Sequence, residues 1–457
     1  MKQAAGKNGN SLDDRRVGRL MIKLTIPAFL GMFVITLYNV VDTIFVGRYV
    51  GAMGIAGLSI VFPLQMLCLG IGQLVGLGGA SLISLRIGAG DTAGAEHALG
   101  NSFSLVALFS GLITIAGLGA MNFWLRVLGA SDTVLPYAGA YMRIILFGVF
   151  FQTFAMAVTG LVRAEGNAKI PVISMSIGAI SNIILDALFI IKFGMGIQGA
   201  ALATVIGQGL SVIYLVSYYE GGKSYLGLHA RFLRLKAEIV KPILSIGSAS
   251  FARMLATSVS AVIVNNTLMR YGTDYSVAAF GILNRILMFA LLPGIAIGQG
   301  LQPVLGFNYG ARRYGLALRS VKLAAVSSTA FCVAVFFLIH FQPEPMARIF
   351  THDARIIALT AHAARIAFFN VYLIGFIMVG SLTFQAIGKA GHSMLTAISR
   401  PVLFLIPLLL ILPRFWSVNG VWLSFPIADA LTFLLTLALF IPQVREMKRQ
   451  SAGAKPA

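Results

Sequence analysis

Acidic residues are scarce in this chain of 457 residues, which has only 15 Asp and Glu against 35 Lys and Arg. Charged residues make up 11% of the sequence and hydrophobic residues 58%, and the mean hydropathy is +0.87. A soluble domain of this length would need many more charged side chains to cover its surface. The composition therefore predicts an all-α polytopic membrane protein.

Signatures of several other protein classes are absent. The two cysteines, Cys68 and Cys332, lie in apolar stretches without metal-ligand spacing, so the sequence predicts no disulfide framework and no cysteine metal site. The glycine-rich GIGQLVGLGGA (70–80) has no preceding strand, and no Walker A pattern occurs; close helix packing explains these glycines better than nucleotide binding. We therefore expect no enzymatic activity and no cofactor. Because the basic residues are spread between apolar runs rather than clustered, we also expect no nucleic-acid partner.

Long apolar runs dominate what is present. We predict twelve membrane-spanning helices, with approximate limits 24–47, 53–85, 99–125, 134–162, 171–191, 197–219, 242–269, 276–307, 320–342, 356–386, 394–413 and 417–442. Most Lys and Arg fall in alternate connections, counted from a polar and basic N-terminus that shows no cleavable signal. This bias predicts a multi-pass protein with both termini in the cytoplasm.

An internal repeat relates the two halves of the chain at an offset of about 222 residues. The matching segments are RYVGAMGIAGLSI (48–60) with RYGTDYSVAAFGI (270–282), RIGAGD (86–91) with NYGARR (308–313), AEGNAK (164–169) with AIGKAG (386–391), and GIQGAALA (196–203) with WSVNGVWL (416–423). Because six spans are an even number, the repeat predicts two six-helix bundles related by a pseudo-two-fold axis along the membrane normal. The predicted domains are an N-terminal tail (1–23), an N-terminal bundle (24–219), a cytoplasmic linker (220–241), a C-terminal bundle (242–442) and a C-terminal tail (443–457).

Three carboxylates lie well inside predicted spans, and such residues are functional candidates because they are costly in a membrane. Asp42 is near the outer end of the first span, and Asp186 is at a similar depth in the fifth. Asn182 precedes Asp186 by one helical turn, and Thr204 lies two turns into the sixth span, so these groups can share one level in the outer half of the bilayer. Tyr38 and Tyr141 are further candidates for the same cluster.

Two carboxylates, an amide oxygen and a hydroxyl form a set of hard oxygen ligands that suits Na⁺. The same carboxylates can instead take up a proton, since two close carboxylates in a low dielectric cannot both stay charged cheaply. In the alternative interpretation, hydrogen bonds satisfy Asp42 and Asp186, which only hold helices together. The third carboxylate, Asp429, stands alone in the last span and is expected to pair with a buried arginine such as Arg285 or Arg365.

At these positions the chain resembles a known family. The segments NVVDTIFVGR, SNIILDALFI, GIQGAALAT and GFNYGARR are similar to those of the multidrug and toxic compound extrusion (MATE) family, in particular its bacterial MepA-like branch. The resemblance spans about residues 17–445. It implies two six-helix bundles in a bacterial inner membrane, a first-lobe cation site at Asp42, Asn182, Asp186 and Thr204, and a helix bend at Pro27. Acids that some members carry in the seventh, eighth and tenth helices are missing here, so a second cation site is not expected.

The resemblance also implies the activity, which is antiport of H⁺ or Na⁺ against cationic or amphiphilic organic compounds. We expect these small molecules and membrane lipid as the partners, with the protein acting as a monomer. The candidate substrate-cavity residues are Tyr38, Asn39, Tyr141, Gln208 and Asp429. A flippase of a lipid-linked precursor is the alternative function, and it would need basic side chains to hold phosphates; Arg143, Arg253, Arg285 and Arg365 within the spans leave it open.

Overall fold

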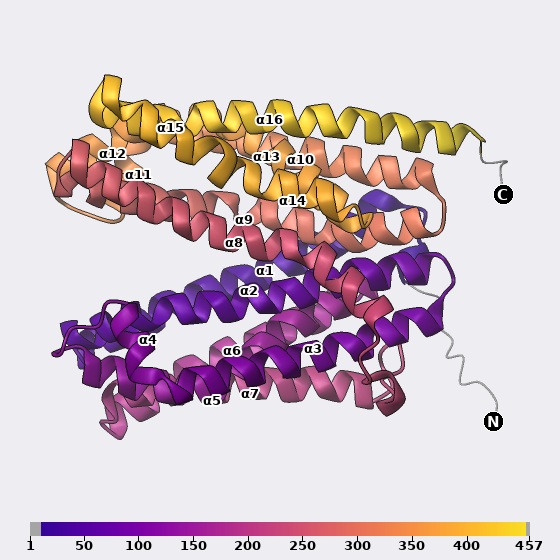
Figure 1. Ribbon diagram of the computed structural model, residues 1–457, viewed down its shortest axis with the longest axis horizontal. Helices are drawn as coiled ribbons and strands as arrows, with labels where there is room; N and C mark the ends of the chain where they lie inside the picture. Colours follow the sequence, from indigo (N-terminus) through magenta and orange to yellow (C-terminus); the bar gives the residue numbers. More distant parts are fainter. Residues whose placement is uncertain (1–10, 454–457) are drawn as a thin grey trace. The chain divides into compact units, whose positions relative to one another are not determined.

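A computed structural model of the protein describes residues 11–453, and every regular element in this range is a helix (Figure 1). Eleven helices are long and apolar enough to cross a membrane, and a bent pair supplies a twelfth span. Large apolar side chains remain exposed on them, such as Ile115 at 73% and Phe147 at 65%, which suits contact with lipid. The predicted all-α class with twelve spans is confirmed.

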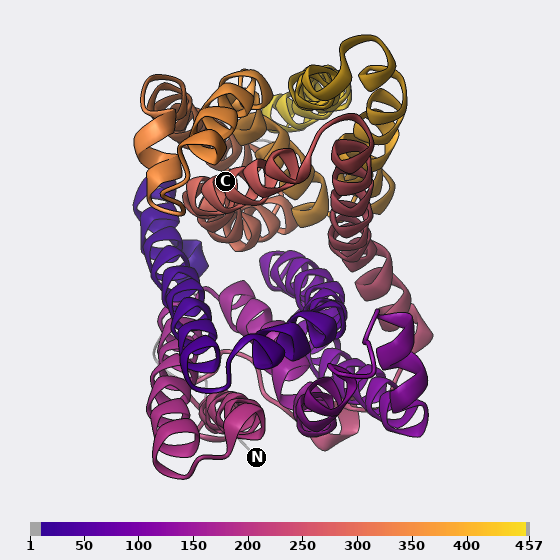
Figure 2. The same cartoon turned by 90° about the vertical axis from the view of Figure 1, so that its left-hand side faces the viewer.

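The chain divides into two compact units. Among the described residues, unit 1 comprises 11–15 and 22–247, and unit 2 comprises 16–21 and 248–453. Two long helices cross these boundaries, at residues 17–21 and 237–247, and each is named below with the unit that contains most of it. The helices of unit 1 are α1 (Val17–Tyr49), α2 (Ala52–Gly88), α3 (Thr92–Gly119), α4 (Met121–Val127), α5 (Leu135–Ala164), α6 (Lys169–Asp186), the π-helical segment η2 (Ala187–Lys192) and α7 (Gly196–Glu220), with short 3₁₀ turns η1 (Ser11–Asp13) and η3 (Ala230–Phe232). Within this unit the helices run lengthwise side by side, as the near end-on view shows (Figure 2).

Unit 2 repeats this order of elements. Its helices are α8 (Ala237–Tyr271), α9 (Asp274–Gly310), α10 (Tyr314–Phe341), α11 (Pro343–Arg348), α12 (Ala354–Ala367), α13 (Val371–Ala386), α14 (Ala390–Ile398), the π-helical segment η4 (Ser399–Leu405), α15 (Ile406–Ile411) and α16 (Pro413–Gly453). The bend of 56° between α12 and α13 divides the predicted span 356–386 into two helices.

The internal repeat is visible in the backbone at the helix ends. Gly166 and Gly388, one repeat apart, both have the left-handed conformation, with φ of 88° and 78°. In each case the next residue donates its N–H to the carbonyl five residues earlier, Asn167 to Val162 and Lys389 to Phe384. This is the hydrogen-bonding pattern of a glycine-terminated helix. Left-handed backbone is accessible to glycine without the steric cost of a Cβ, which explains why these two glycines match in sequence.

Three helices extend past the expected limits of the bundles. α1 begins at Val17, within the predicted tail 1–23, and α8 begins at Ala237, within the predicted linker 220–241. α16 continues to Gly453, well into the predicted tail 443–457. Hydropathy marks only the apolar part of a helix, whereas the backbone ladder continues into polar flanks that stay hydrated.

The glycine-rich stretch of α2 is a packing surface, as the sequence predicted. A Cβ added to Gly76 would lie 2.7 Å from Ala157 Cα on α5, and a Cβ added to Gly72 would lie 2.7 Å from Met156 Cβ. Between membrane helices, small residues allow this close approach and the dispersion contacts that replace a hydrophobic driving force. α5 is thereby held against α2, with Tyr141 facing the core of unit 1.

The segment after α7 is fastened to unit 1 by buried polar groups. Asn101 on α3 donates to the carbonyl of Phe232 at 3.0 Å and accepts from the N–H of Lys236 at 2.8 Å. Glu165, just past the end of α5, accepts from Ser224 Oγ at 2.6 Å and from the N–H of Tyr225 at 3.1 Å. These bonds fix a stretch for which the sequence predicted only a cytoplasmic linker.

Glu165 gives this anchor a pH dependence. Burial raises the pKa of Glu165 from 4.5 to about 7, against the opposing effect of its hydrogen bonds. A raised pKa means that the folded state favours the protonated acid, so this stabilising contribution is complete below about pH 4.5 and is lost as the pH rises through about 7.

We therefore expect Glu165→Gln, which imitates the protonated acid, to gain stability relative to the wild type as the pH rises from 5 to 8. The difference between the two melting temperatures should grow by about 2–5 °C over this range, as measured on the purified proteins in one detergent. Glu96→Gln, at a second carboxylate that binds this segment through the N–H of Gly227, is the control. A difference that does not change with pH would contradict this prediction.

Candidate ion-coupling site

Asp42 on α1 and Asp186 at the end of α6 meet inside unit 1. Their exposed fractions are 9% and 0%, and their carboxyl groups lie within hydrogen-bonding contact of each other. The Oδ1 atom of each carboxyl is buried and has no hydrogen-bond partner among the described residues. Two touching carboxyls with unsatisfied oxygens need a shared proton or a bound cation, because two bare charges would repel in this environment.

Close helix crossings bring the two acids together. A Cβ added to Gly31 on α1 would lie 2.6 Å from Met175 Sδ on α6, so α1 packs tightly against that helix. One turn further along α6, the carbonyl oxygen of Gly178 would lie 2.7 Å from a Cβ added to Gly207 on α7. The glycines therefore set the spacing of the three helices that carry Asp42, Asp186 and Thr204.

Asn182 connects Asp186 to Thr204. We assign the amide orientation in which its nitrogen donates to Asp186 Oδ2 at 3.2 Å and its oxygen accepts from the N–H and Oγ1 of Thr204 at 3.2 and 3.3 Å. The opposite orientation leaves only a bond from the amide nitrogen to Thr204 Oγ1 and points the amide oxygen at acceptors. All three side chains are buried, so this network holds one face of Asp186 in place.

Two tyrosines complete the cluster. Tyr141 on α5 is 2% exposed, and its hydroxyl accepts a hydrogen bond of 3.1 Å from Gln65 Nε2 on α2. Tyr38 and Tyr141 both lie within electrostatic range of Asp42 and Asp186. Gln65 was not among the predicted site residues; the signal that could have found it is an amide inside an apolar span.

Three other predicted residues lie less centrally. Asn39 is exposed and donates to the carbonyl of Ile35 on its own helix at 2.9 Å. Gln208 on α7 is half-buried, one turn past Thr204, and has no hydrogen-bond partner in the described part of the chain. Pro27 lies inside α1, which continues as one helix through this residue. Because proline has no backbone N–H, the carbonyl of Lys23 lacks its usual helical hydrogen bond.

A π-helical segment follows Asp186 directly, at Ala187–Lys192. Such segments widen a helix by one residue per turn and often occur at functional sites. Here the widening begins at the carboxylate, where it changes the direction of the side chains that follow. Apolar periodicity in this stretch gave no sign of it.

Within residues 11–453, no group of three or more His, Cys, Asp or Glu side chains is placed to hold a metal ion. The ligands that this site can offer are therefore two carboxyls with the oxygens of Asn182, Thr204 and the nearby tyrosines. Such a set can bind a monovalent cation or one proton, and it changes its net charge by one when it does so.

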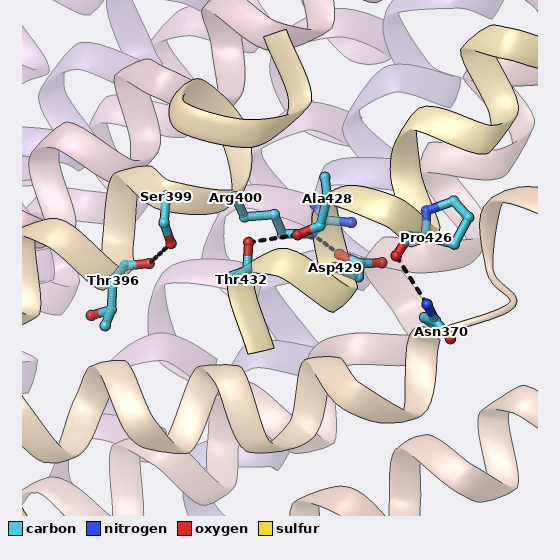
Figure 3. Close-up of polar contacts among 8 residues, drawn as sticks. All are labelled: Asn370, Thr396, Ser399, Arg400, Pro426, Ala428, Asp429 and Thr432. Carbon is cyan, nitrogen blue, oxygen red and sulfur yellow. Dashed lines mark hydrogen bonds and ion pairs between the residues drawn. The ribbon is translucent and has the colours of Figure 1, made fainter. Parts of the chain in front are cut away.

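Asp429 on α16 lies in unit 2 and has a different partner from the one expected. It pairs with Arg400 of η4, not with Arg285 or Arg365, which are both exposed (Figure 3). Asp429 is 1% exposed, and the Arg400 side chain is 27% exposed. The position of a residue along a span predicts its depth in the membrane. It does not predict which way the helix is rotated or where a π-helical segment lies, and these decide which arginine meets Asp429.

The twelve spans in two similar units, with a buried pair of carboxylates in the first, define a polytopic membrane protein with an ionisable site inside its first unit. The MatE family pattern matches residues 27–188 and 249–411. The chain therefore belongs to the MatE family, and the resemblance seen in its sequence is confirmed.

Individual proteins agree with this assignment. The chain is 25% identical to the "Multidrug export protein MepA" of Staphylococcus saprophyticus over 92% of both chains. It is 27% identical to the protein in "Crystal structure of MATE in the bent conformation", with a TM-score of 0.92 over 98% of this chain and all of the other. The structure described as "MATE in the straight conformation" matches equally well in identity, with a TM-score of 0.91 over 97% of this chain and all of the other.

The ion pair of unit 2 predicts a stability effect. Asp429→Asn should destabilise the protein by about 3 kcal/mol or more, because it leaves the Arg400 guanidinium without its carboxylate. The double variant Asp429→Asn with Arg400→Gln should lose less stability than Asp429→Asn alone, because it leaves no unpaired guanidinium. Thermal unfolding in detergent measures both.

The surface pair Lys389–Glu446 is the control, since its side chains are 35% and 45% exposed. Glu446→Gln should cost less than about 1 kcal/mol. If Asp429→Asn is no more harmful than Glu446→Gln, Arg400 does not depend on Asp429.

Proposed function

We propose that this chain is a secondary active multidrug efflux transporter, which antiports H⁺ or Na⁺ against cationic or amphiphilic organic compounds by alternating access. One observation carries the proposal, which is the contact between the buried carboxyls of Asp42 and Asp186 with an unsatisfied oxygen on each. A pair that must gain and lose a cation is what coupling to an ion gradient requires. The printed name of the staphylococcal relative, a multidrug export protein, supports the same activity.

The coupling follows from charge. When a proton or Na⁺ enters from outside, the pair becomes less negative, and the cost of holding charge in the membrane falls. A cationic compound is attracted while the pair is negative and released once the pair is neutralised. The cation and the compound thus weaken each other's binding, which by linkage is the condition for antiport.

Helix α1 is the element that we expect to respond. It carries Asp42 and also Pro27, whose missing N–H leaves a backbone carbonyl free and offers a bend point. The titles of two related structures, which name a bent and a straight conformation of MATE, agree with a protein that changes between two shapes. Protonation or Na⁺ binding at Asp42 would change the packing of α1 against α6, where Gly31 makes close contact.

The setting of the transporter is part of the proposal. We infer a bacterial inner membrane with both termini in the cytoplasm, since the basic residues are concentrated in the segments on that side. We keep the predicted division into the tail 1–23, the bundle 24–219, the linker 220–241, the bundle 242–442 and the tail 443–457. We also propose that the active form is a monomer surrounded by lipid. A lipid-linked precursor flippase remains the second candidate, favoured by Arg253 of unit 2, which has no acidic partner among the described residues.

Transport in proteoliposomes with separate control of the pH and Na⁺ gradients tests this function. Asp42→Asn removes the exchangeable charge with little change of size, so ethidium efflux should fall at least tenfold while the protein still folds. Asp186→Asn should behave in the same way. Asp132→Asn, at an exposed acid that pairs with Arg126, should transport like the wild type.

If Asp42→Asn exports ethidium at the wild-type rate under both the pH and the Na⁺ gradient, the acid pair has a structural role only. Transport of a lipid-linked precursor without ethidium efflux by the wild type would favour the flippase.

A further inference from the structure

Arg253 is a membrane-embedded cation in unit 2 that the ion-coupling site does not use. It lies in α8, about 24 Å along the helix from Ala237 and about 27 Å from Tyr271. An arginine near the middle of a spanning helix is costly unless a counter-charge or water meets it. Arg253 is therefore a candidate for a functional role in unit 2.

The contacts of Arg253 leave most of its donors free. Its Nη2 donates to Ser250 Oγ at 3.3 Å, one helical turn away. The Ser250 hydroxyl also accepts from Gln385 Nε2 of α13 at 2.9 Å. The Arg253 side chain has no other hydrogen bond or ion pair among the described residues, so one of its five N–H donors is used.

No carboxylate of unit 2 is available to Arg253. The acidic residues among positions 248–453 are Asp274, Glu344, Asp353, Asp429 and Glu446. Three of these acids lie at helix ends far along the chain direction from the start of α8, which are Asp274, Glu344 and Asp353. The other two are already paired, Glu446 with Lys389 and Asp429 with Arg400. The same unit thus contains one half-buried arginine paired with a carboxylate, drawn in Figure 3, and one half-buried arginine without a carboxylate.

The surroundings of Arg253 are polar along one face of α8. Ser250, Arg253 and Thr257 are spaced at i, i+3 and i+7, so their side chains follow one another on the same side of the helix. Thr257 is exposed and Arg253 is half-buried, so this face is not sealed inside the unit. A lipid-facing surface would not carry a row of polar side chains beside an unpaired guanidinium.

We propose that Arg253, whose guanidinium is positioned by the buried Ser250, binds the carboxylate of a transported aromatic compound, so that substrates include zwitterions as well as cations. A guanidinium with free N–H groups in a plane matches the two oxygens of a carboxylate. The buried Ser250 hydroxyl accepts a hydrogen bond from the guanidinium and is itself held by the Gln385 amide of α13. The inference rests on the proposed function, because it assigns a substrate class to the same transporter.

A pair of dyes that differ by one charge tests the inference. Rhodamine 110 has a free carboxylate, and rhodamine 123 is its methyl ester, so the two share a ring system and a cationic charge. Binding to the full-length protein in phosphatidylcholine nanodiscs is followed by fluorescence polarisation. Arg253→Gln should weaken rhodamine 110 binding about tenfold or more, as expected for the loss of a charged hydrogen-bond donor, and change rhodamine 123 binding less than twofold.

Two further variants sharpen the result. Arg253→Lys keeps the charge without the planar donor pair and should lie between the wild type and Arg253→Gln for rhodamine 110. Arg285→Gln, at an exposed arginine of the neighbouring α9, should leave both dyes unaffected. Thermal unfolding of each variant confirms that the protein is folded.

Four outcomes overturn the proposal. Equal loss of both dyes in Arg253→Gln would make Arg253 structural, and unchanged rhodamine 110 binding would make it irrelevant to anions. In either case rhodamine 123 binding by the wild type would leave the proposed export of cations standing, whereas binding of neither dye would count against that function too. If phosphatidylglycerol in the nanodiscs displaces rhodamine 110 from the wild type but not from Arg253→Lys or Arg253→Gln, the occupant is a lipid phosphate.

Discussion

The contact between two carboxyl groups within a membrane protein is the interaction on which this structure depends. Asp42 and Asp186 are buried, touch each other and each keep one unsatisfied oxygen. In a low dielectric such a pair is tolerable only with a proton or a cation between its members. The glycine crossings of α1, α6 and α7 and the Asn182 amide keep the pair together.

Unit 2 uses the same order of helices for a different chemistry. At the repeat offset of 221–222 residues, Arg400 and Asp429 align with or next to Gly178 and Gly207. In unit 1 that pair of glycines lets two helices touch, and in unit 2 an ion pair occupies the corresponding elements. The repeat therefore conserves the backbone, as Gly166 and Gly388 show, while the buried polar groups differ between the units.

The sequence was most informative where a physical rule is strict. Lipid forces polar backbone into helices, so the twelve spans could be predicted from hydropathy alone, and charged residues inside spans are rare enough to identify Asp42 and Asp186 as a pair. Rotation about a helix axis is not fixed by hydropathy. The partner of Asp429 was therefore wrong, and Asn39 proved to be exposed.

Other features depend on details that a single sequence does not encode locally. The π-helical segments at Ala187–Lys192 and Ser399–Leu405 depend on tertiary packing, and no pattern of residues in the sequence predicted them. Gln65 joins the site only because α2 packs against α5 through glycines. The relation of the two bundles by an axis along the membrane normal stays a prediction, as do the roles assigned to the site residues.

The central claim is that one cation and one drug molecule exclude each other through the acid pair. Equilibrium binding of ethidium to the purified protein tests it directly, with the pH varied without Na⁺ and then Na⁺ varied at a fixed alkaline pH. The account predicts that the Kd rises as H⁺ or Na⁺ increases, and that Asp186→Asn has a Kd independent of both. A wild-type Kd that does not change with either cation would contradict the account.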